Sequence, residues 1–207
     1  MDLNHIELGI LQTNCYVIGG EDGLVIIDPG YCPPELISLI EDDGRKPEAI
    51  LLTHGHFDHT MGVDQLREHF DIPVRALIQE KQTLETTEYN LSTMFSGQGV
   101  LLESPVSYFS EGEVLTYAGL KFETIWVPGH SQGGCCYYVR DEEVLFSGDS
   151  LFCGSVGRTD LAGGDMTTLV ENLREKVMTL PDKTAVCPGH GPGTDIAFEK
   201  QFNMFVR

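Results

Sequence analysis

The segment His54-Gly55-His56-Phe57-Asp58-His59 is the most informative part of this chain. It contains three of the seven histidines in 207 residues and follows the apolar run from Ala49 to Leu52, which predicts a buried strand. Imidazole nitrogens and carboxylate oxygens are good ligands for zinc and other first-row metals. The segment contains more ligand-type side chains than a single tetrahedral ion can bind from one short loop. It therefore predicts two ions side by side. The alternative is a loop of ordinary polar residues.

Three further candidate ligands come just after other predicted strands. They are His130 after Val127-Pro128-Gly129, Asp149 after Phe146-Ser147-Gly148, and His190 after Val186-Cys187-Pro188-Gly189. Each follows a turn of small residues, and functional sites are often built at such strand ends. Any one of them could be an ordinary turn residue. Together with the histidine segment they predict one metal site assembled from several strand ends.

The remaining pattern alternates short strands with helices. Apolar residues at helical spacing predict helices after Pro33, over 62–70, over 166–177 and over 195–202, and short apolar runs predict strands and hairpins between them. The stretch 90–103 has weak periodicity and is expected to form a loop over the site. Because strands followed by helices occur in both halves, we expect two sheets packed face to face with helices outside, forming a single domain over 1–207.

Composition excludes several classes of function. The net charge of -19 repels phosphate backbones and anionic lipids, so we expect no nucleic-acid partner and no membrane partner. The N-terminus lacks a basic and apolar leader, and no apolar run approaches the ~20 residues needed to cross a bilayer. The six cysteines include no C-x-x-C pair and are expected to be reduced thiols in a cytoplasmic protein.

The combination of His54-x-His56-x-Asp58-His59 with the later His130, Asp149 and His190 resembles the metallo-β-lactamase superfamily over nearly the whole chain. Further motifs resemble its short, single-domain glyoxalase II-like hydrolases of bacteria. These motifs are Leu11-Gln12-Thr13-Asn14-Cys15-Tyr16, Asp28-Pro29-Gly30, Pro128-Gly129-His130-Ser131, Gly154-Ser155-Val156-Gly157-Arg158-Thr159-Asp160 and Pro188-Gly189-His190-Gly191-Pro192. The resemblance implies an α/β fold, a four-layer αβ/βα sandwich of two mixed β-sheets flanked by helices.

The resemblance also implies ligand roles for two divalent metal ions. His54, His56 and His130 are expected to hold the first ion and Asp58, His59 and His190 the second, with Asp149 bridging both. We expect zinc, with iron and manganese as alternatives. A metal-bound hydroxide is then expected to hydrolyse a small-molecule thioester, such as S-lactoylglutathione, with Asp58 as a catalytic residue that orients the hydroxide.

The sequence departs from full-length glyoxalase II in two places. We expect no C-terminal helical glutathione-binding domain, and a lysine and a tyrosine that contact glutathione are replaced by Arg158 and Asp160. Arg158 is expected to bind a substrate carboxylate, or instead to pair with Asp160 or Asp165. Asp28 is expected to hold loop backbone rather than to react.

Two rival functions use similar residues. A persulfide dioxygenase, with one iron held by two histidines and an aspartate, is the main alternative. A non-catalytic metal-binding scaffold is the other, and it would not need Asp58 for partner binding.

Overall fold

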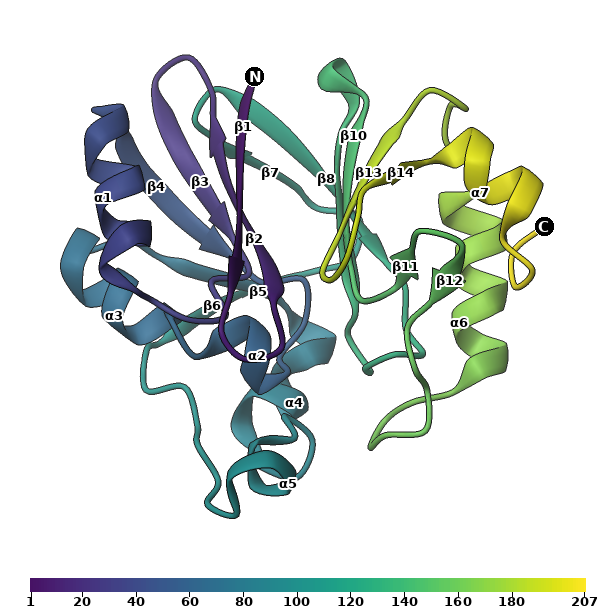
Figure 1. Cartoon of the computed structure of the whole chain (residues 1–207), viewed down its shortest axis with the longest axis horizontal. Helices are drawn as coiled ribbons and strands as arrows, with labels where there is room; N and C mark the ends of the chain where they lie inside the picture. The colour runs from purple at the N-terminus through teal and green to yellow at the C-terminus, as the bar shows by residue number, and fades with distance from the viewer.

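Two six-stranded mixed sheets form the centre of the molecule (Figure 1). The computed structural model describes residues 1–207 apart from the side chain of Ser96. In the first sheet the order is β1 to β6, with antiparallel pairs up to β3 and parallel pairs from β3 to β6. Its strands are β1 (Asp2–Leu8), β2 (Thr13–Gly19), β3 (Gly23–Ile27), β4 (Lys46–Leu51), β5 (Val74–Leu77) and β6 (Val106–Phe109).

The second sheet has the order β14-β13-β10-β9-β8-β7, and only its β10–β13 pair is parallel. Its strands are β7 (Val114–Tyr117), β8 (Leu120–Trp126), β9 (Cys135–Val139), β10 (Val144–Gly148), β13 (Ala185–Pro188) and β14 (Thr194–Asp195). A small hairpin of β11 (Leu151–Phe152) and β12 (Ser155–Val156) lies outside both sheets.

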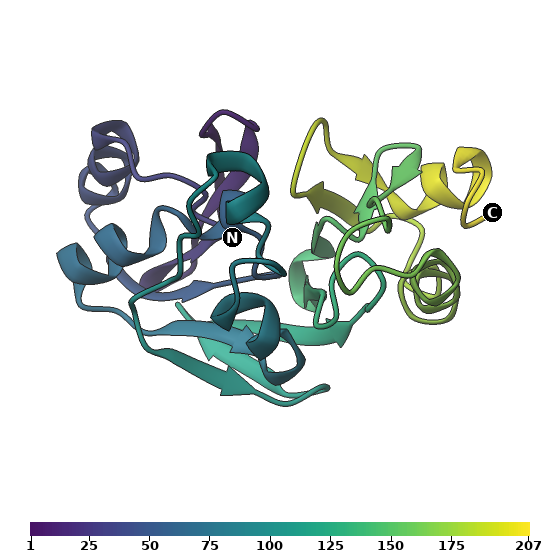
Figure 2. The same ribbon diagram turned by 90° about the horizontal axis from the view of Figure 1, so that it is seen from below.

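Helices cover the outer face of each sheet, so the expected four-layer sandwich is confirmed (Figure 2). On the first sheet lie α1 (Pro34–Asp43) and α3 (Val63–Phe70), and on the second lie α6 (Met166–Asn172), its π-helical continuation Leu173–Val177, and α7 (Ile196–Phe202). The short helices α2 (Phe57–Thr60), α4 (Lys81–Glu85) and α5 (Ser92–Ser96) and the 3-10 turn Ile78–Glu80 lie near the lower end of the first sheet in Figure 1. Within the described chain, no helix is long and apolar enough to cross a membrane.

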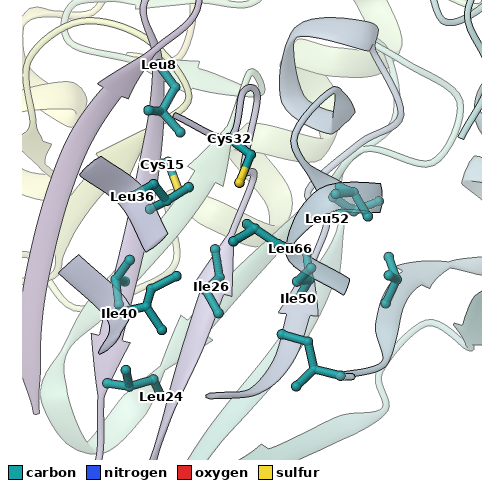
Figure 3. Close-up of a cluster of buried hydrophobic side chains, with 14 of the residues drawn as sticks. Leu8, Cys15, Leu24, Ile26, Cys32, Leu36, Ile40, Ile50, Leu52 and Leu66 are labelled. Atoms are coloured by element: carbon teal, nitrogen blue, oxygen red, sulfur yellow. The ribbon is translucent and has the colours of Figure 1, made fainter. Parts of the chain in front are cut away.

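Three apolar layers fill the spaces between these four layers. In the outer layer of the first sheet, Leu36 and Ile40 of α1 face Ile26 and Ile50 of the strands (Figure 3). A second layer, including Phe122, Tyr137 and Phe146, lies between the sheets, and a third lies beneath α6 and α7. Successive strand residues point to opposite layers, because side chains alternate along a strand.

Adjacent residues confirm that alternation at two predicted strands. Ile50 belongs to the outer layer while Ala49 and Leu51 belong to the inter-sheet layer, as expected for a strand covered on both faces. Cys135 and Cys136 likewise point into different layers, so they do not form a paired thiol site.

Two expectations are corrected by the structure. The predicted strand beginning at Ala49 starts earlier, at Lys46 of β4, and ends at Leu51. The stretch 90–103 is not a plain loop, because it contains α5. That helix is too short to give a helical periodicity that sequence reading can detect.

Candidate metal centre

All seven expected ligand positions lie at one edge of the sandwich, where the two sheets meet. β8, β10 and β13 run in the same direction, because β9 is antiparallel to both β8 and β10 while β13 is parallel to β10. Their carboxyl ends therefore share an edge and carry His130, Asp149 and His190 in the turns that follow. The histidine segment comes directly after β4 of the other sheet and includes α2, which presents Asp58 and His59.

The first ligand group contains His54, His56 and His130, all buried. Nδ1 of His56 lies 3.0 Å from Nε2 of His130. The His54 ring centroid is 4.6 Å from that of His56 and 4.9 Å from that of His130. Two residues of one loop thus meet a third from the opposite sheet, as expected for one ion site.

The second group contains Asp58, His59 and His190. Oδ2 of Asp58 lies 3.2 Å from Nε2 of His190 and 3.6 Å from Nε2 of His59. Asp149 lies between the groups: its Oδ1 is 3.4 Å from Nε2 of His59, and its Oδ2 is 3.6 Å from Nε2 of both His130 and His190. A carboxylate in contact with both groups has the position expected of a bridging ligand.

These spacings fit metal binding. Two ligand atoms each ~2.0–2.1 Å from a tetrahedral ion lie roughly 3.3–3.4 Å apart, and the contacts above span 3.0 to 3.6 Å. Nε2 of His54, Nε2 of His59 and Oδ1 of Asp149 are also buried without a hydrogen-bond partner among the described residues. Leaving such atoms unpaired costs free energy, whereas a cation between the groups would satisfy them.

Four of the imidazoles are oriented through their other nitrogen. Nδ1 of His130 donates to the carbonyl of Arg158 at 2.8 Å, and Nδ1 of His190 donates to the carbonyl of Leu11 at 3.1 Å. Nδ1 of His59 lies 2.9 Å from Asp28 Oδ2, and Nδ1 of His54 lies 3.1 Å from Thr53 Oγ1. Such contacts fix each ring so that its Nε2 is left free to bind a metal ion.

Asp28 supports the site rather than acting as a ligand. Although it lies near His54 and His59, Oδ1 accepts from the Thr53 amide at 2.8 Å and Oδ2 from the Thr53 hydroxyl. Oδ2 also contacts His59 Nδ1. The expectation that Asp28 holds loop backbone is therefore confirmed, and its contact with His59 is an additional finding.

Glu80 is the main supporting residue that sequence reasoning missed. Its buried carboxylate accepts from the Gly55 amide at 2.9 Å, the Ser131 hydroxyl at 3.0 Å and the Gly133 amide at 2.6 Å. Gly55 lies between the first two histidines and Ser131 follows His130, so one carboxylate ties together the loops that supply the first ligand group. Glu80 lies in no recognisable motif, and no local signal could have identified it.

Two glycines make room for the ligands. A Cβ on Gly189 would lie 2.1 Å from Asp149 Oδ1, so any larger residue before His190 would displace the Asp149 carboxylate. Gly55 has a packing role, because a Cβ there would meet Leu84 at 2.9 Å, and the residue does not have a positive φ.

Burial and neighbouring charges set the protonation of the ligands in the protein alone. Burial, together with the other imidazoles, holds the pKa of His54 well below its usual value and lowers the pKa of His56 to about 3. Burial opposes a charge on His59, yet Asp149 and Asp58 hold its pKa well above the usual range. His54 and His56 are therefore neutral, as metal binding requires, while His59 must release a proton when it binds a cation.

Arg158 lies in the segment that follows β12, and its guanidinium is paired. Nε is 2.8 Å from Asp160 Oδ1 and Nη2 is 2.9 Å from Asp160 Oδ2, in an exposed fork-to-fork arrangement. The ion pair considered as an alternative is thus present with Asp160. The Arg158 carbonyl, by contrast, has a clear place in the site because it holds His130.

This fold and this cluster of histidine and aspartate side chains define a metallo-hydrolase type of protein. A family model described as the metallo-beta-lactamase superfamily matches residues 8–190, and the chain belongs to that superfamily.

Related proteins match along their full length. The chain is 41% identical to "Probable metallo-hydrolase YqgX" of Bacillus subtilis over 207 residues, covering 100% of this chain and 98% of that protein. It is 34% identical to "Hydroxyacylglutathione hydrolase GloC" of Haemophilus influenzae over 208 residues, covering 100% of this chain and 98% of that protein.

Solved structures agree with the fold. A B3 metallo-beta-lactamase, BLEG-1, has a TM-score of 0.94 at 41% identity, covering 99% of both chains. TTHA1623 in a di-iron-bound form has a TM-score of 0.87 at 38% identity, covering 98% of this chain and 100% of that one. ETHE1 from Myxococcus xanthus has a TM-score of 0.77 at 25% identity, covering 99% of this chain and 84% of that one.

Proposed function

We propose that this protein is a binuclear metal-dependent thioester hydrolase of the hydroxyacylglutathione hydrolase type. The observation that carries the proposal is the convergence of two three-residue ligand groups, with Asp149 in contact with both. The full-length similarity to a protein named hydroxyacylglutathione hydrolase supports the thioester as the substrate class. A mononuclear iron persulfide dioxygenase, the rival function, would need only some of these candidate ligands.

The proposed ligands are His54, His56 and His130 for one ion, Asp58, His59 and His190 for the other, and Asp149 for both. Two divalent ions held there would supply a hydroxide nucleophile at neutral pH and polarise the scissile carbonyl, and zinc is the metal that we propose for both. Iron remains the alternative metal, because a structural neighbour contains two iron ions.

Asp58 is the proposed catalytic carboxylate. Burial opposes its ionisation, but His59 and His190 hold the pKa of Asp58 below its usual value, so it is charged at neutral pH. Thr13 Oγ1 donates to Oδ2 of Asp58 at 3.2 Å and helps fix the carboxylate plane. An ionised, fixed carboxylate can bind a cation and accept a hydrogen bond from the attacking nucleophile.

A thioester suits the side chains around this centre. The thiolate leaving group has a low pKa and departs without a proton donor, so the chain need not supply a general acid. Arg158 is paired with Asp160, but its guanidinium is exposed and can bind a second carboxylate as well. We propose that it contacts an anionic part of the substrate.

The test is hydrolysis of S-D-lactoylglutathione by purified, metal-loaded protein, followed as loss of the thioester with and without a chelator. We expect turnover that the chelator abolishes and that readdition of metal restores. Asp58→Ala should lower kcat at least about 100-fold, as removal of a general base or orienting group does. Turnover of a persulfide with oxygen consumption, and none of any thioester, would reverse the assignment in favour of the dioxygenase.

A further inference from the structure

An open apolar cleft adjoins the metal centre. It has a volume of ≈ 510 Å³, within the ~300–1,000 Å³ typical of ligand-binding clefts. Its wall comes from the β1–β2 turn, α2 and its flank, and the 92–100 segment with α5. The main apolar side chains of this wall are Ile10, Leu11, Phe57, Met61, Phe95 and Val100.

Several of these side chains are unusually exposed for their size. Ile10 is 86% exposed, Phe95 50% and Met61 49%, although the chain carries a net charge of -19. A contiguous exposed apolar surface on such an acidic protein commonly marks a binding site. The rings of Phe57 and Phe95 pack with centroids 4.9 Å apart, which holds α5 against α2 and gives the cleft a fixed wall.

The cleft opens onto the reacting centre. Asp58 lines it and also lies 3.2 Å from Nε2 of His190. The Leu11 carbonyl accepts from Nδ1 of His190, so the turn that forms one wall is also attached to a candidate ligand. A molecule whose reacting carbonyl lies at the metal centre can therefore extend directly into the cleft.

The charges favour an uncharged occupant. Among the residues that line the cleft no cationic side chain occurs, and its one carboxylate, Asp58, faces the metal centre. The nearest proposed anion contact, Arg158, lies after β12 on the side of the second sheet, whereas the cleft belongs to the first. The two flanks of the site thus differ in polarity.

We propose that this cleft binds an apolar, uncharged half of the thioester substrate, so that the enzyme prefers thioesters with a long hydrocarbon group on one side of the scissile bond. The proposal rests on the proposed thioester hydrolysis and specifies its substrate class. Ile10, Met61 and Phe95 are the residues that determine this preference. The expected gain is between about twofold and fourfold in kcat/KM per added methylene, the upper value matching burial of ~0.8 kcal/mol per CH₂.

The test uses metal-loaded protein and two series of thioesters. One series lengthens the acyl group from acetyl to hexanoyl on N-acetylcysteamine, and the other lengthens an alkanethiol from ethyl to hexyl on acetate. We expect kcat/KM to rise with length in one series. Ile10→Ser and Phe95→Ser should flatten that rise, while Met204→Ser, which removes a 73% exposed apolar side chain outside the cleft, should leave the ratio of the longest to the shortest substrate of that series unchanged.

Flat kcat/KM in both series, or a slope that Ile10→Ser and Phe95→Ser leave intact, would overturn the proposal. If no thioester is hydrolysed, the proposed function fails instead, and the cleft is tested by binding of the neutral dye N-phenyl-1-naphthylamine. Saturable fluorescence that weakens in Ile10→Ser but not in Met204→Ser supports an apolar site. An equal response in the parent protein, Ile10→Ser and Met204→Ser would contradict an apolar binding site in the cleft.

Discussion

At the scale of single residues, Glu80 shows how much of the centre depends on a side chain that binds no metal. Its carboxylate joins the loop that contains His54 and His56 to the loop that contains His130. Burial holds the pKa of Glu80 above its usual value, although the backbone hydrogen bond from Gly55 and the other donors oppose this rise. These donors stabilise the buried carboxylate, and it in turn fixes the distance between the two loops.

Glu80→Ala should therefore weaken metal binding by about 10- to 100-fold, the range typical of residues that orient metal ligands. Zinc affinity is measured by competition with a chromophoric chelator, and circular dichroism checks that the variant is folded. Glu85→Ala on α4, which removes an exposed carboxylate, is the matched control and should bind zinc normally. Unchanged affinity in Glu80→Ala would show that the two loops keep their positions without it.

Arg158 offers a second test at this scale. If its guanidinium contacts an anionic part of the substrate, Arg158→Ala should raise KM for S-D-lactoylglutathione about tenfold with little change in kcat, because it removes binding shared by ground and transition state. The melting temperature should barely change, since the exposed pair with Asp160 contributes little. Arg158→Lys should recover part of the affinity. Identical KM in all three proteins would restrict Arg158 to its carbonyl contact with His130.

The candidate ligands could be identified from sequence because their signals are local. Three histidines and an aspartate in one short loop stand out by spacing alone. Glu80 and Thr13 could not be predicted, because each acts on residues distant in the chain: Thr13 contacts Asp58, which is 45 positions away. No spacing rule links such pairs.

At the scale of elements, two helices that cover the second sheet have aspartate caps. The N-cap of α7 is Asp195, whose Oδ1 accepts from the Phe198 amide at 2.7 Å, and the helix directly follows β14. α6 begins in the same way, with Asp165 accepting from the Thr168 amide. Both caps pair one unsatisfied amide of the first turn.

Asp195→Ala should lower the free energy of unfolding by about 1 kcal/mol, since it removes an N-cap acceptor. Urea denaturation with a constant m-value measures the change. Asp195→Asn keeps a capping oxygen and should remain close to the parent protein. A loss of equal size in both variants would assign the effect to charge rather than to the cap.

Strong periodic helices and buried strands were predicted, whereas marginal elements were not. β1 went unpredicted because most of its residues are exposed and its polar residues follow no alternation. It forms as a strand because β2 provides a complete antiparallel partner from Thr13 to Gly19. α5 was likewise missed, because tertiary contacts such as Phe95 on Phe57 stabilise a helix of five residues.

At the scale of the whole molecule, the candidate ligands come from both sheets. Those before position 60 follow β4 of the first sheet, and His130, Asp149 and His190 follow β8, β10 and β13 of the second. Bound metal would therefore link the two halves of the sandwich. Stability and metal content should be coupled as a result.

Zinc at 100 times its dissociation constant should add about 2.7 kcal/mol of stability, which corresponds to roughly 5–10 °C in Tm for a chain of this size. Differential scanning calorimetry with and without chelator measures the shift. His190→Ala, which removes one ligand of the second group, should reduce it. A Tm independent of metal would mean that the two halves pack without help from the ion.

The inter-sheet layer provides the other link between the halves. Phe146 is fully buried there, and its ring lies 5.2 Å from the ring of Tyr16 in the opposite sheet. Phe146→Ala should lower the free energy of unfolding by about 3–5 kcal/mol, the cost of deleting a large core side chain. Phe202→Ala, where the ring is 53% exposed, should cost much less. Similar losses in chemical denaturation would contradict the assignment of the core.

The sequence by itself determined the candidate ligands, their places at strand ends and the layered fold, because periodicity and spacing are properties of consecutive residues. Tertiary structure alone decided which ring nitrogen faces each partner, how Glu80 joins two loops and where the apolar cleft lies. The physical reason is that these features arise where distant segments meet: the cleft needs the 9–12 turn, α2 with the following Met61, and the 92–100 segment packed at one edge. Packing of that kind depends on the whole fold and leaves no local pattern.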